Sequence, residues 1–156
     1  MRVGFGYDVH PLIFGRKLIL GGEIIPYQKG LDGHSDADVL IHSLIDALLG
    51  AAGEGDIGQH FPDNDEQYKN ISSLKLLENT YEILKSKKLT INNIDVSVVL
   101  EEPRIVPFII KMKNNIAQVL KISSEKINIK ATTNEMMGFI GRREGAVSYC
   151  VVSLNE

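Results

Sequence analysis

The chain has 156 residues, a formal net charge of −3 and one cysteine. That length suits a single domain, and 44% hydrophobic with 24% charged residues is typical of a globular protein. The acidic balance, without a Lys/Arg stripe among aromatic residues, argues against nucleic-acid binding. No apolar run approaches the roughly 20 residues of a membrane span, which argues against membrane insertion.

The first 22 residues indicate two strands, over 2–10 and 17–20. A turn at 14–15 separates them and would allow a hairpin, and the glycine pair at 21–22 ends the second strand. The N-terminal stretch has neither the apolar core of a signal peptide nor an Arg/Ser-rich transit segment.

A helix is predicted from Asp36 to about Ala52, where apolar residues recur on one broad face. Ser35 would cap its first turn while Asp38 reaches back, as in a capping box. Gly53 would end the helix.

The rest of the chain predicts two more helices, over 71–87 and from Pro107 onward, and strands over 94–100, 127–132 and 146–154. Helices and strands alternate without a linker or repeat, so we expect one domain over residues 1–156. The fold class is α/β (α+β), with a single sheet of about four to five strands and the helices packed on one face. Cys150 lies in the last strand, which fits a small buried residue in a reducing compartment.

Asp8 and His10, in GYDVHP, are the first candidates for chemistry. Residues two apart on a strand share a face, with Cα atoms roughly 6.7 Å apart. A carboxylate and an imidazole placed in this way can both reach one Zn²⁺ at roughly 2.0 to 2.2 Å. Alone, however, such a pair is more often a hydrogen-bonded or solvated strand face.

His42 is the candidate third ligand. It lies between Asp38 and Asp46 at four-residue spacing, on one face of the predicted helix. Three protein ligands would leave one tetrahedral position open, as in catalytic zinc sites, and Asp46 could orient the His42 ring. The alternative is a core histidine bonded to a helical neighbour.

Three further segments could bind ligands. His34 precedes a helix start that favours anions, or is a surface loop residue. The glycines of GEGDIGQHFPDND (53–65) allow close backbone approach and its aspartates add acceptors, unless the segment is a solvated turn. In KATTNEMMGFIGRREG (130–145), threonine hydroxyls could meet phosphate oxygens and Glu135 could bind Mg²⁺.

The motifs GYDVHP, GHSDADVLIH, LLGAAGEGDIGQHFPD and KATTNEMMGFIGRREG, in this order, resemble the 2-C-methyl-D-erythritol 2,4-cyclodiphosphate synthase family of the non-mevalonate isoprenoid pathway. The resemblance covers essentially the whole chain. It implies a compact α/β subunit that assembles as a homotrimer, with three active sites between neighbouring subunits. It also implies a bacterial cytoplasmic location, or a plastid-type organelle if a transit peptide was removed.

The resemblance implies a reaction that depends on two metals. Asp8, His10 and His42 would bind Zn²⁺, and Glu135 would bind Mg²⁺ or Mn²⁺ bridging the substrate diphosphate. The 2-phosphate of 4-diphosphocytidyl-2-C-methyl-D-erythritol 2-phosphate would attack the β-phosphorus, which releases CMP and closes the cyclic diphosphate. Such a phosphorus–oxygen lyase needs positioning and charge neutralisation more than a protein nucleophile.

The resemblance also assigns residues to the substrate. His34 and Thr133 would be catalytic and stabilise the transition state. The methylerythritol side of the site would comprise Ser35, Asp56, Ile57, Gly58 and Asp63, and Phe61 and Asp65 would also bind the substrate. The cytidine pocket of the adjacent subunit would comprise Leu100, Arg104, Ile105, Val106 and Thr132.

Positions around the implied trimer axis match Tyr7, Phe139, Arg142 and Glu144, where the family encloses an apolar cavity for an isoprenoid-like diphosphate. Arg142 could instead pair with Glu144 at the subunit interface.

The segment LEEPRIVP departs from the family. Family members are less acidic at Glu101 and Glu102 and often carry lysine where this chain has Arg104. Arginine should still meet a phosphate or ribose, with different geometry.

Two alternatives come from other functional classes. A zinc-dependent phosphohydrolase would use the open metal position for an activated water, although no H-E-x-x-H motif lies beside the ligands. A non-catalytic binding module whose fold is held together by metal would unfold on chelation. A core of 156 residues should instead remain folded without its metal.

Overall fold

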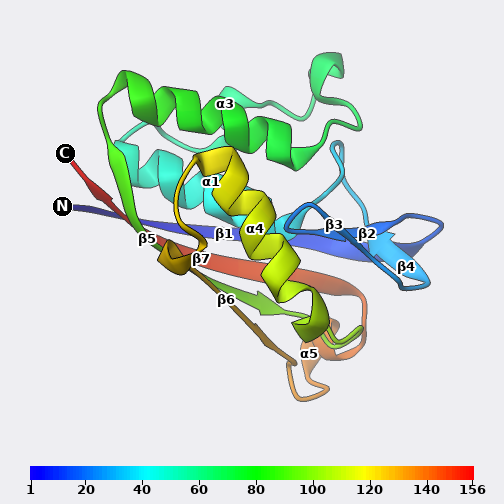
Figure 1. The fold of residues 1–156 in the computed structure, drawn as a ribbon. Coiled ribbons are helices and arrows are strands. Elements are labelled where there is room, and N and C mark those ends of the chain that lie inside the picture. Colours follow the sequence, from blue (N-terminus) through cyan, green and yellow to red (C-terminus); the bar gives the residue numbers. More distant parts are fainter.

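A computed structural model describes residues 1–156. The main sheet has five strands in the order β4-β1-β7-β5-β6 (Figure 1). Only β5 and β6 pair in parallel, and the other neighbours are antiparallel. A two-stranded ribbon lies beside this sheet. The strands are β1 (Arg2–Phe14), β2 (Leu18–Leu20), β3 (Glu23–Ile25), β4 (Lys29–Leu31), β5 (Thr90–Val99), β6 (Ile127–Thr132) and β7 (Gly145–Asn155).

The three long helices cover one face of the sheet, as the sequence predicted (Figure 1). They are α1 (Val39–Ala52), α3 (Ser73–Ser86) and α4 (Ile109–Leu120). Helix α1 packs on β1 and β7, and α3 contacts both α1 and α4. The short elements are α2 (Ile57–His60), α5 (Gly138–Gly141) and the 3₁₀ turns η1 (Glu66–Tyr68), η2 (Val106–Phe108) and η3 (Ser124–Lys126). The α+β expectation is therefore confirmed.

Helix α1 is the centre of the core, because it lies between the sheet and α3. Its residues Leu40, Leu44 and Leu48 are fully buried, as expected for a helix that is apolar nearly all round. Cys150 of β7 is also buried and forms no disulfide.

Two glycines of β1 allow α1 to approach the sheet closely. A Cβ atom at Gly6 would lie 1.9 Å from the carbonyl oxygen of Ser43, and one at Gly4 would lie 1.9 Å from that of Ala47. Any side chain at either position would push the helix away. Since Asp8 and His10 follow on the same face of β1, this close packing brings α1 within reach of both.

The other face of the sheet is apolar and exposed. Val3, Phe5, Tyr7, Tyr149 and Val151 alternate with the inward-facing residues of β1 and β7 and are between 41% and 63% exposed. The rings of Tyr7 and Tyr149 lie 5.4 Å apart, centroid to centroid. Contiguous apolar surfaces of this kind mark sites of protein association.

Two local predictions are wrong. Strand β1 does not form a hairpin with the next strand: β2 pairs with β3, whereas β1 pairs with β4 and β7. Helix α1 begins at Val39, and its N-cap is Asp38 in place of Ser35. The Asp38 carboxylate accepts hydrogen bonds from the amides of Ile41, Gly21 and Gly22, which ties the β2–β3 turn to the helix start.

None of the helices has both the length and the apolar character that crossing a membrane requires.

Candidate metal centre and active-site cavities

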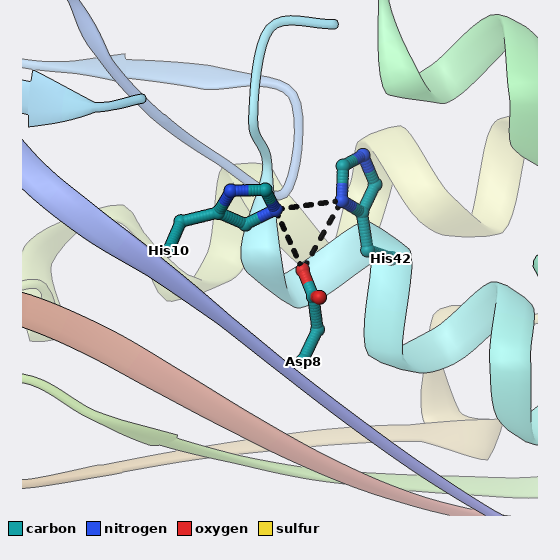
Figure 2. A group of neighbouring side chains, drawn as sticks. All are labelled: Asp8, His10 and His42. Carbon is teal, nitrogen blue, oxygen red and sulfur yellow. Dashed lines mark hydrogen bonds and ion pairs between the residues drawn. The ribbon is translucent and has the colours of Figure 1, made fainter. Parts of the chain in front are cut away.

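Asp8, His10 and His42 converge between β1 and α1 (Figure 2). The Asp8 Oδ2 atom lies 3.0 Å from His10 Nε2 and 3.1 Å from His42 Nδ1. The two imidazole nitrogens are 3.2 Å apart. All three side chains are mostly buried, with 25%, 18% and 11% of each exposed.

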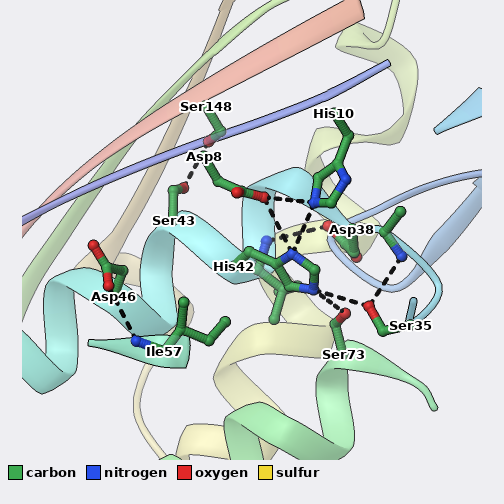
Figure 3. Close-up of polar contacts among 12 residues, drawn as sticks. Asp8, His10, Ser35, Asp38, His42, Ser43, Asp46, Ile57, Ser73 and Ser148 are labelled. Carbon is green, nitrogen blue, oxygen red and sulfur yellow. Dashed lines mark hydrogen bonds and ion pairs between the residues drawn. The ribbon is translucent and has the colours of Figure 1, made fainter. Parts of the chain in front are cut away.

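The outer partners of the two rings fix which nitrogens face the centre, and Figure 3 shows those of His42. His10 Nδ1 lies 2.7 Å from the carbonyl oxygen of Asp32, so it donates there and leaves Nε2 with a lone pair. His42 Nε2 lies 2.8 Å from the hydroxyl of Ser73 and 3.1 Å from that of Ser35. The Ser73 hydroxyl donates its own proton to Asp36, so it accepts from His42.

This arrangement fits a metal ion. When the outer ring nitrogens carry the protons, two imidazole lone pairs and a carboxylate oxygen face one point, and a bound cation or a shared proton would satisfy them. Their separations are close to the about 3.3 Å that ligand atoms keep around tetrahedral zinc with bonds of roughly 2.0–2.1 Å. Three protein ligands leave a position open, which is the pattern of a catalytic site.

The electrostatics also favour a cation. Burial opposes the charged form of Asp8, but hydrogen bonds from His10 and His42 outweigh it and lower the pKa of Asp8. Burial likewise opposes protonation of His10, but the hydrogen bond and charge of Asp8 outweigh it and raise the pKa of His10. A positive charge among the three groups, carried by a metal ion or by a proton, is therefore favoured.

Asp46 does not orient His42, so this prediction is wrong. Its carboxylate accepts a hydrogen bond from the amide of Ile57, 3.2 Å away, and so holds the start of α2 (Figure 3). The orienting groups are Ser73 and Asp36, which the sequence analysis missed. Helical spacing pointed to Asp46, but the Nε2 edge of His42 faces α3, which lies 31 residues further along the chain.

A cavity of about 480 Å³ opens beside the three candidate ligands. It brings together nine of the residues that the sequence analysis selected: Asp8, His10, His34, Ser35, His42, Ile57, Gly58, Phe61 and Asp63. The residues that it adds are Gly33, Pro62, Asn64, Tyr68 and Leu76.

Asp56 and Asp65 do not line this cavity; they support it. The Asp56 carboxylate caps α2 by accepting from the amide of Gln59, and Asp65 caps η1 by accepting from the amide of Gln67. The ring of His34 lies 2.9 Å from the carbonyl oxygen of Asp65, which holds the 53–65 segment against the loop before α1.

Arg16 holds that loop from the other side, and no sequence motif pointed to it. Its guanidinium donates to the carboxylate of Asp32 and to the carbonyl oxygens of Gly33 and Ser35, at 2.9 to 3.2 Å. The backbone around His34 is therefore fixed from both sides.

A second cavity of about 440 Å³ lies between the ends of β5 and β6. It contains the predicted cytidine-pocket residues together with Thr133: Leu100, Arg104, Ile105, Val106, Thr132 and Thr133. Within one chain, Thr133 and His34 thus belong to different cavities.

Three remaining candidates line neither cavity. Glu135 is exposed in the loop after β6. Phe139 of α5 is 39% exposed. Arg142 forms an ion pair with Glu144, with 2.9 Å between Nε and Oε1.

Comparison with known proteins supports the resemblance found in the motifs. The YgbB family model matches residues 1–155. The 2-C-methyl-D-erythritol 2,4-cyclodiphosphate synthases of Desulforamulus reducens and Alkaliphilus metalliredigens are each 56% identical over all of this chain, which covers 99% and 98% of their lengths.

Solved structures agree in fold. The bifunctional IspDF from Campylobacter jejuni matches with a TM-score of 0.95 and 44% identity over 98% of this chain, which spans 42% of that protein. The IspF of Plasmodium falciparum, solved as a CDP complex, matches with a TM-score of 0.86 and 32% identity over 98% of this chain and 94% of its own. The chain therefore belongs to the YgbB family.

Proposed function

We propose that this chain converts 4-diphosphocytidyl-2-C-methyl-D-erythritol 2-phosphate to 2-C-methyl-D-erythritol 2,4-cyclodiphosphate and CMP. The observation that carries the proposal is the convergence of Asp8, His10 and His42 at the edge of a cavity of about 480 Å³. Synthases of this name that are 56% identical over the full chain support it.

The metal centre would be held by Asp8, His10 and His42, and a second divalent ion, Mg²⁺ or Mn²⁺, by Glu135. Bound Zn²⁺ would supply Lewis-acid polarisation of the β-phosphate, and the second ion would neutralise charge on the diphosphate. The two imidazole ligands, the carboxylate and the open position support a catalytic zinc, and the lack of cysteine ligands argues against a structural one.

The residues of the chain would bind and orient the substrate. Asp63, Ile57 and Gly58 line the first cavity and would hold the methylerythritol part, with acceptors for its hydroxyl groups. The 2-phosphate oxygen forms a bond to the β-phosphorus, and the bond from that phosphorus to the CMP oxygen breaks. Thr133 would donate to the phosphate oxygens as charge develops there, and His34 would stabilise the transition state beside them.

The second cavity would bind the cytidine of a substrate held mainly by a neighbouring subunit. Arg104 lies at its rim and is exposed, so its guanidinium can meet a phosphate or ribose. The P. falciparum relative, solved as a CDP complex, supports a cytidine nucleotide as ligand.

We propose a homotrimer in which each active site joins the first cavity of one subunit to the second cavity of its neighbour. The separation of His34 from Thr133 within one chain supports this arrangement. So does the exposed apolar face formed by Val3, Phe5 and Tyr149, which association would bury. The molar mass in solution should be about three times 17.3 kDa, and a monomer would contradict the trimer.

Tyr7 and Phe139 are proposed to line a cavity on the trimer axis that accepts an isoprenoid-like diphosphate. Arg142 would meet the diphosphate or fix the interface through its pair with Glu144. If Arg142→Ala left both the trimer and the ligand occupancy unchanged, neither role would stand.

We further propose one domain over residues 1–156 and a cytoplasmic location, which a single buried cysteine without a disulfide supports.

The function is tested by incubating the protein with the cytidyl substrate and both metals and measuring the products. Release of CMP without inorganic phosphate is expected. Inorganic phosphate as the product would instead identify a phosphohydrolase, and the absence of any turnover would favour a binding module.

A further inference from the structure

The loop after β6 has an unusual backbone. Glu135 and Met136 both adopt left-handed conformations, with φ of 52° and 62°. Residues with a Cβ atom rarely occupy this region, because it is sterically unfavourable. The loop also contains Thr133, and Glu135 is its proposed metal-binding residue. The loop has internal hydrogen bonds, from the Glu135 amide to Thr133 Oγ1 at 3.3 Å and from the Met137 amide to the Asn134 carbonyl oxygen at 2.9 Å, and it is also held from outside.

Glu101 supplies such contacts. It lies just beyond the end of β5, 33 residues before Asn134 in the sequence. One carboxylate oxygen accepts a hydrogen bond from the amide of Asn134 at 3.0 Å, and the other accepts from the amide of Met136 at 3.2 Å. Both carboxylate oxygens of Glu101 thus accept hydrogen bonds from the two amides that flank Glu135. Hydrogen bonds to a charged acceptor are stronger than those between neutral groups.

The neighbouring Glu102 holds the far end of the same segment. Its carboxylate lies 2.9 Å from a guanidinium nitrogen of Arg143. The acidic pair that departs from the family pattern therefore has both carboxylates engaged by the 134–143 segment. This accounts for two acidic side chains on the wall of a cavity proposed to bind a nucleotide.

We propose that Glu101 is a positioning residue, which acts by holding Thr133 and Glu135 in the geometry needed for phosphoryl transfer. The inference rests on the proposed function, because those two residues act on the diphosphate there. Glu101 also lines the second cavity, but both of its carboxylate oxygens accept from loop amides, so its role is to hold the loop. Its carboxylate sets the direction of the loop backbone, on which the Thr133 hydroxyl and the Glu135 carboxylate are carried.

The test compares Glu101→Ala and Glu101→Gln with two controls. Glu101→Gln retains one acceptor oxygen but places an NH₂ group where the second oxygen was. Glu102→Gln releases Arg143 without touching the Asn134 and Met136 amides. Glu125→Gln removes a carboxylate that is exposed, outside the loop and without a partner among the ion pairs. Each variant trimer is examined by hydrogen–deuterium exchange over residues 133–137, by steady-state kinetics and by its bound zinc.

In Glu101→Ala, exchange over residues 133–137 should accelerate by about tenfold or more, since a hydrogen bond to a charged group contributes roughly this factor. The value of kcat should fall about 10- to 100-fold, as misplaced catalytic groups cause, with a smaller change in KM and with zinc content intact. Glu101→Gln should fall between wild type and Glu101→Ala. Glu125→Gln should match wild type, and Glu102→Gln should leave the Asn134 and Met136 amides protected.

Unchanged exchange in Glu101→Ala would overturn the proposal, and so would faster exchange with unchanged kcat. Loss of zinc or of the trimer together with kcat would reveal a general structural role and would also overturn it. If wild-type protein made no cyclic product, the proposed function would fail, whereas the exchange measurement would still decide whether Glu101 orders the loop.

Discussion

The hydroxyl of Ser73 lies 2.8 Å from Nε2 of His42, so the first turn of α3 orients the candidate metal ligand that α1 carries (Figure 3). Ser73 is in turn held by the Asp36 carboxylate, which accepts from both its hydroxyl and its amide. This chain of contacts keeps the proton of His42 on Nε2 and leaves Nδ1 free for the metal.

Ser73→Ala should weaken zinc binding by about 10- to 100-fold, the usual cost of removing a group that orients a metal-binding histidine. The affinity is measured by competition with a chromogenic chelator. Ser72→Ala is the matched control, because the adjacent Ser72 caps α3 without a side-chain hydrogen bond. Equal zinc affinity in the two variants would contradict the orienting role of Ser73.

Removal of the metal should abolish turnover without unfolding the protein, because the core around α1 does not depend on the metal. His42→Ala should do the same. His60→Ala should retain activity, because the His60 ring bonds to the backbone carbonyl of Glu54 and lies beside Phe61, away from the three candidate ligands. Thermal melting with and without chelator should show one cooperative transition in both cases. Unfolding on chelation would instead favour a binding module whose fold depends on its metal.

Zinc binding should weaken as the pH falls through the pKa of His10, which Asp8 raises above its usual 6.5. Protons then compete with the metal for the same nitrogen. The stability of the metal-free protein has the opposite pH dependence. The Asp8–His10 pair contributes fully to the free energy of unfolding below the pKa of unfolded histidine, and this contribution is lost as the pH rises through the raised pKa of His10. Calorimetric zinc titrations from pH 5 to 8 check the pH dependence of zinc binding. A flat affinity would contradict the ligand role of His10.

Gly6→Ala should destabilise the protein by about 1–3 kcal/mol or more, because its new Cβ atom would lie 1.9 Å from the carbonyl oxygen of Ser43. Displacing α1 should also move His42 away from Asp8 and lower zinc affinity. Gly50 lies within α1 itself. A Cβ atom at this position would have no atom within 4 Å, so Gly50→Ala should be neutral or stabilising. Urea denaturation of both variants gives the comparison, and equal stability would argue against the close approach of β1 and α1.

Two inactive variants should complement each other if active sites lie between subunits. His34→Ala damages the first cavity and Thr133→Ala the second, so a mixed trimer keeps one site in which both are intact. Random mixing of equal amounts should restore activity at about a quarter of the sites. Co-expressed subunits with distinguishable tags provide the mixed trimers. No recovery in isolated mixed trimers would mean that both residues act within one chain.

Much of the fold could be predicted from the sequence, because the helices and strands have clear periodic patterns. Strand β6 occupies residues 127–132, as predicted, and α3 begins two residues later than expected. Strand β1 continues past Pro11, where a strand end was expected, because the Pro11 carbonyl still accepts from the amide of Asp32. Strand pairing could not be predicted, since the β1–β7 ladder joins residues such as Tyr7 and Tyr149 from opposite ends of the chain.

The candidate metal ligands could be proposed from local spacing, but the residues that hold them in place could not. Two-residue spacing on a strand placed Asp8 and His10 together, and the structure bears this out. Ser73, Asp36 and Arg16 reach the site only through packing between distant segments, which leaves no periodic signal in the sequence. The role of Asp46 was predicted wrongly for the same reason: helical spacing identifies neighbours along α1, not the groups that the ring faces.

The most direct test of the central claim is ³¹P NMR of the protein with 4-diphosphocytidyl-2-C-methyl-D-erythritol 2-phosphate, first with zinc and magnesium and then with each removed. We expect the resonances of a cyclic diphosphate and of CMP, both lost when either metal is withdrawn. Inorganic phosphate in place of the cyclic product, or no reaction with both metals present, would contradict the proposed synthase activity.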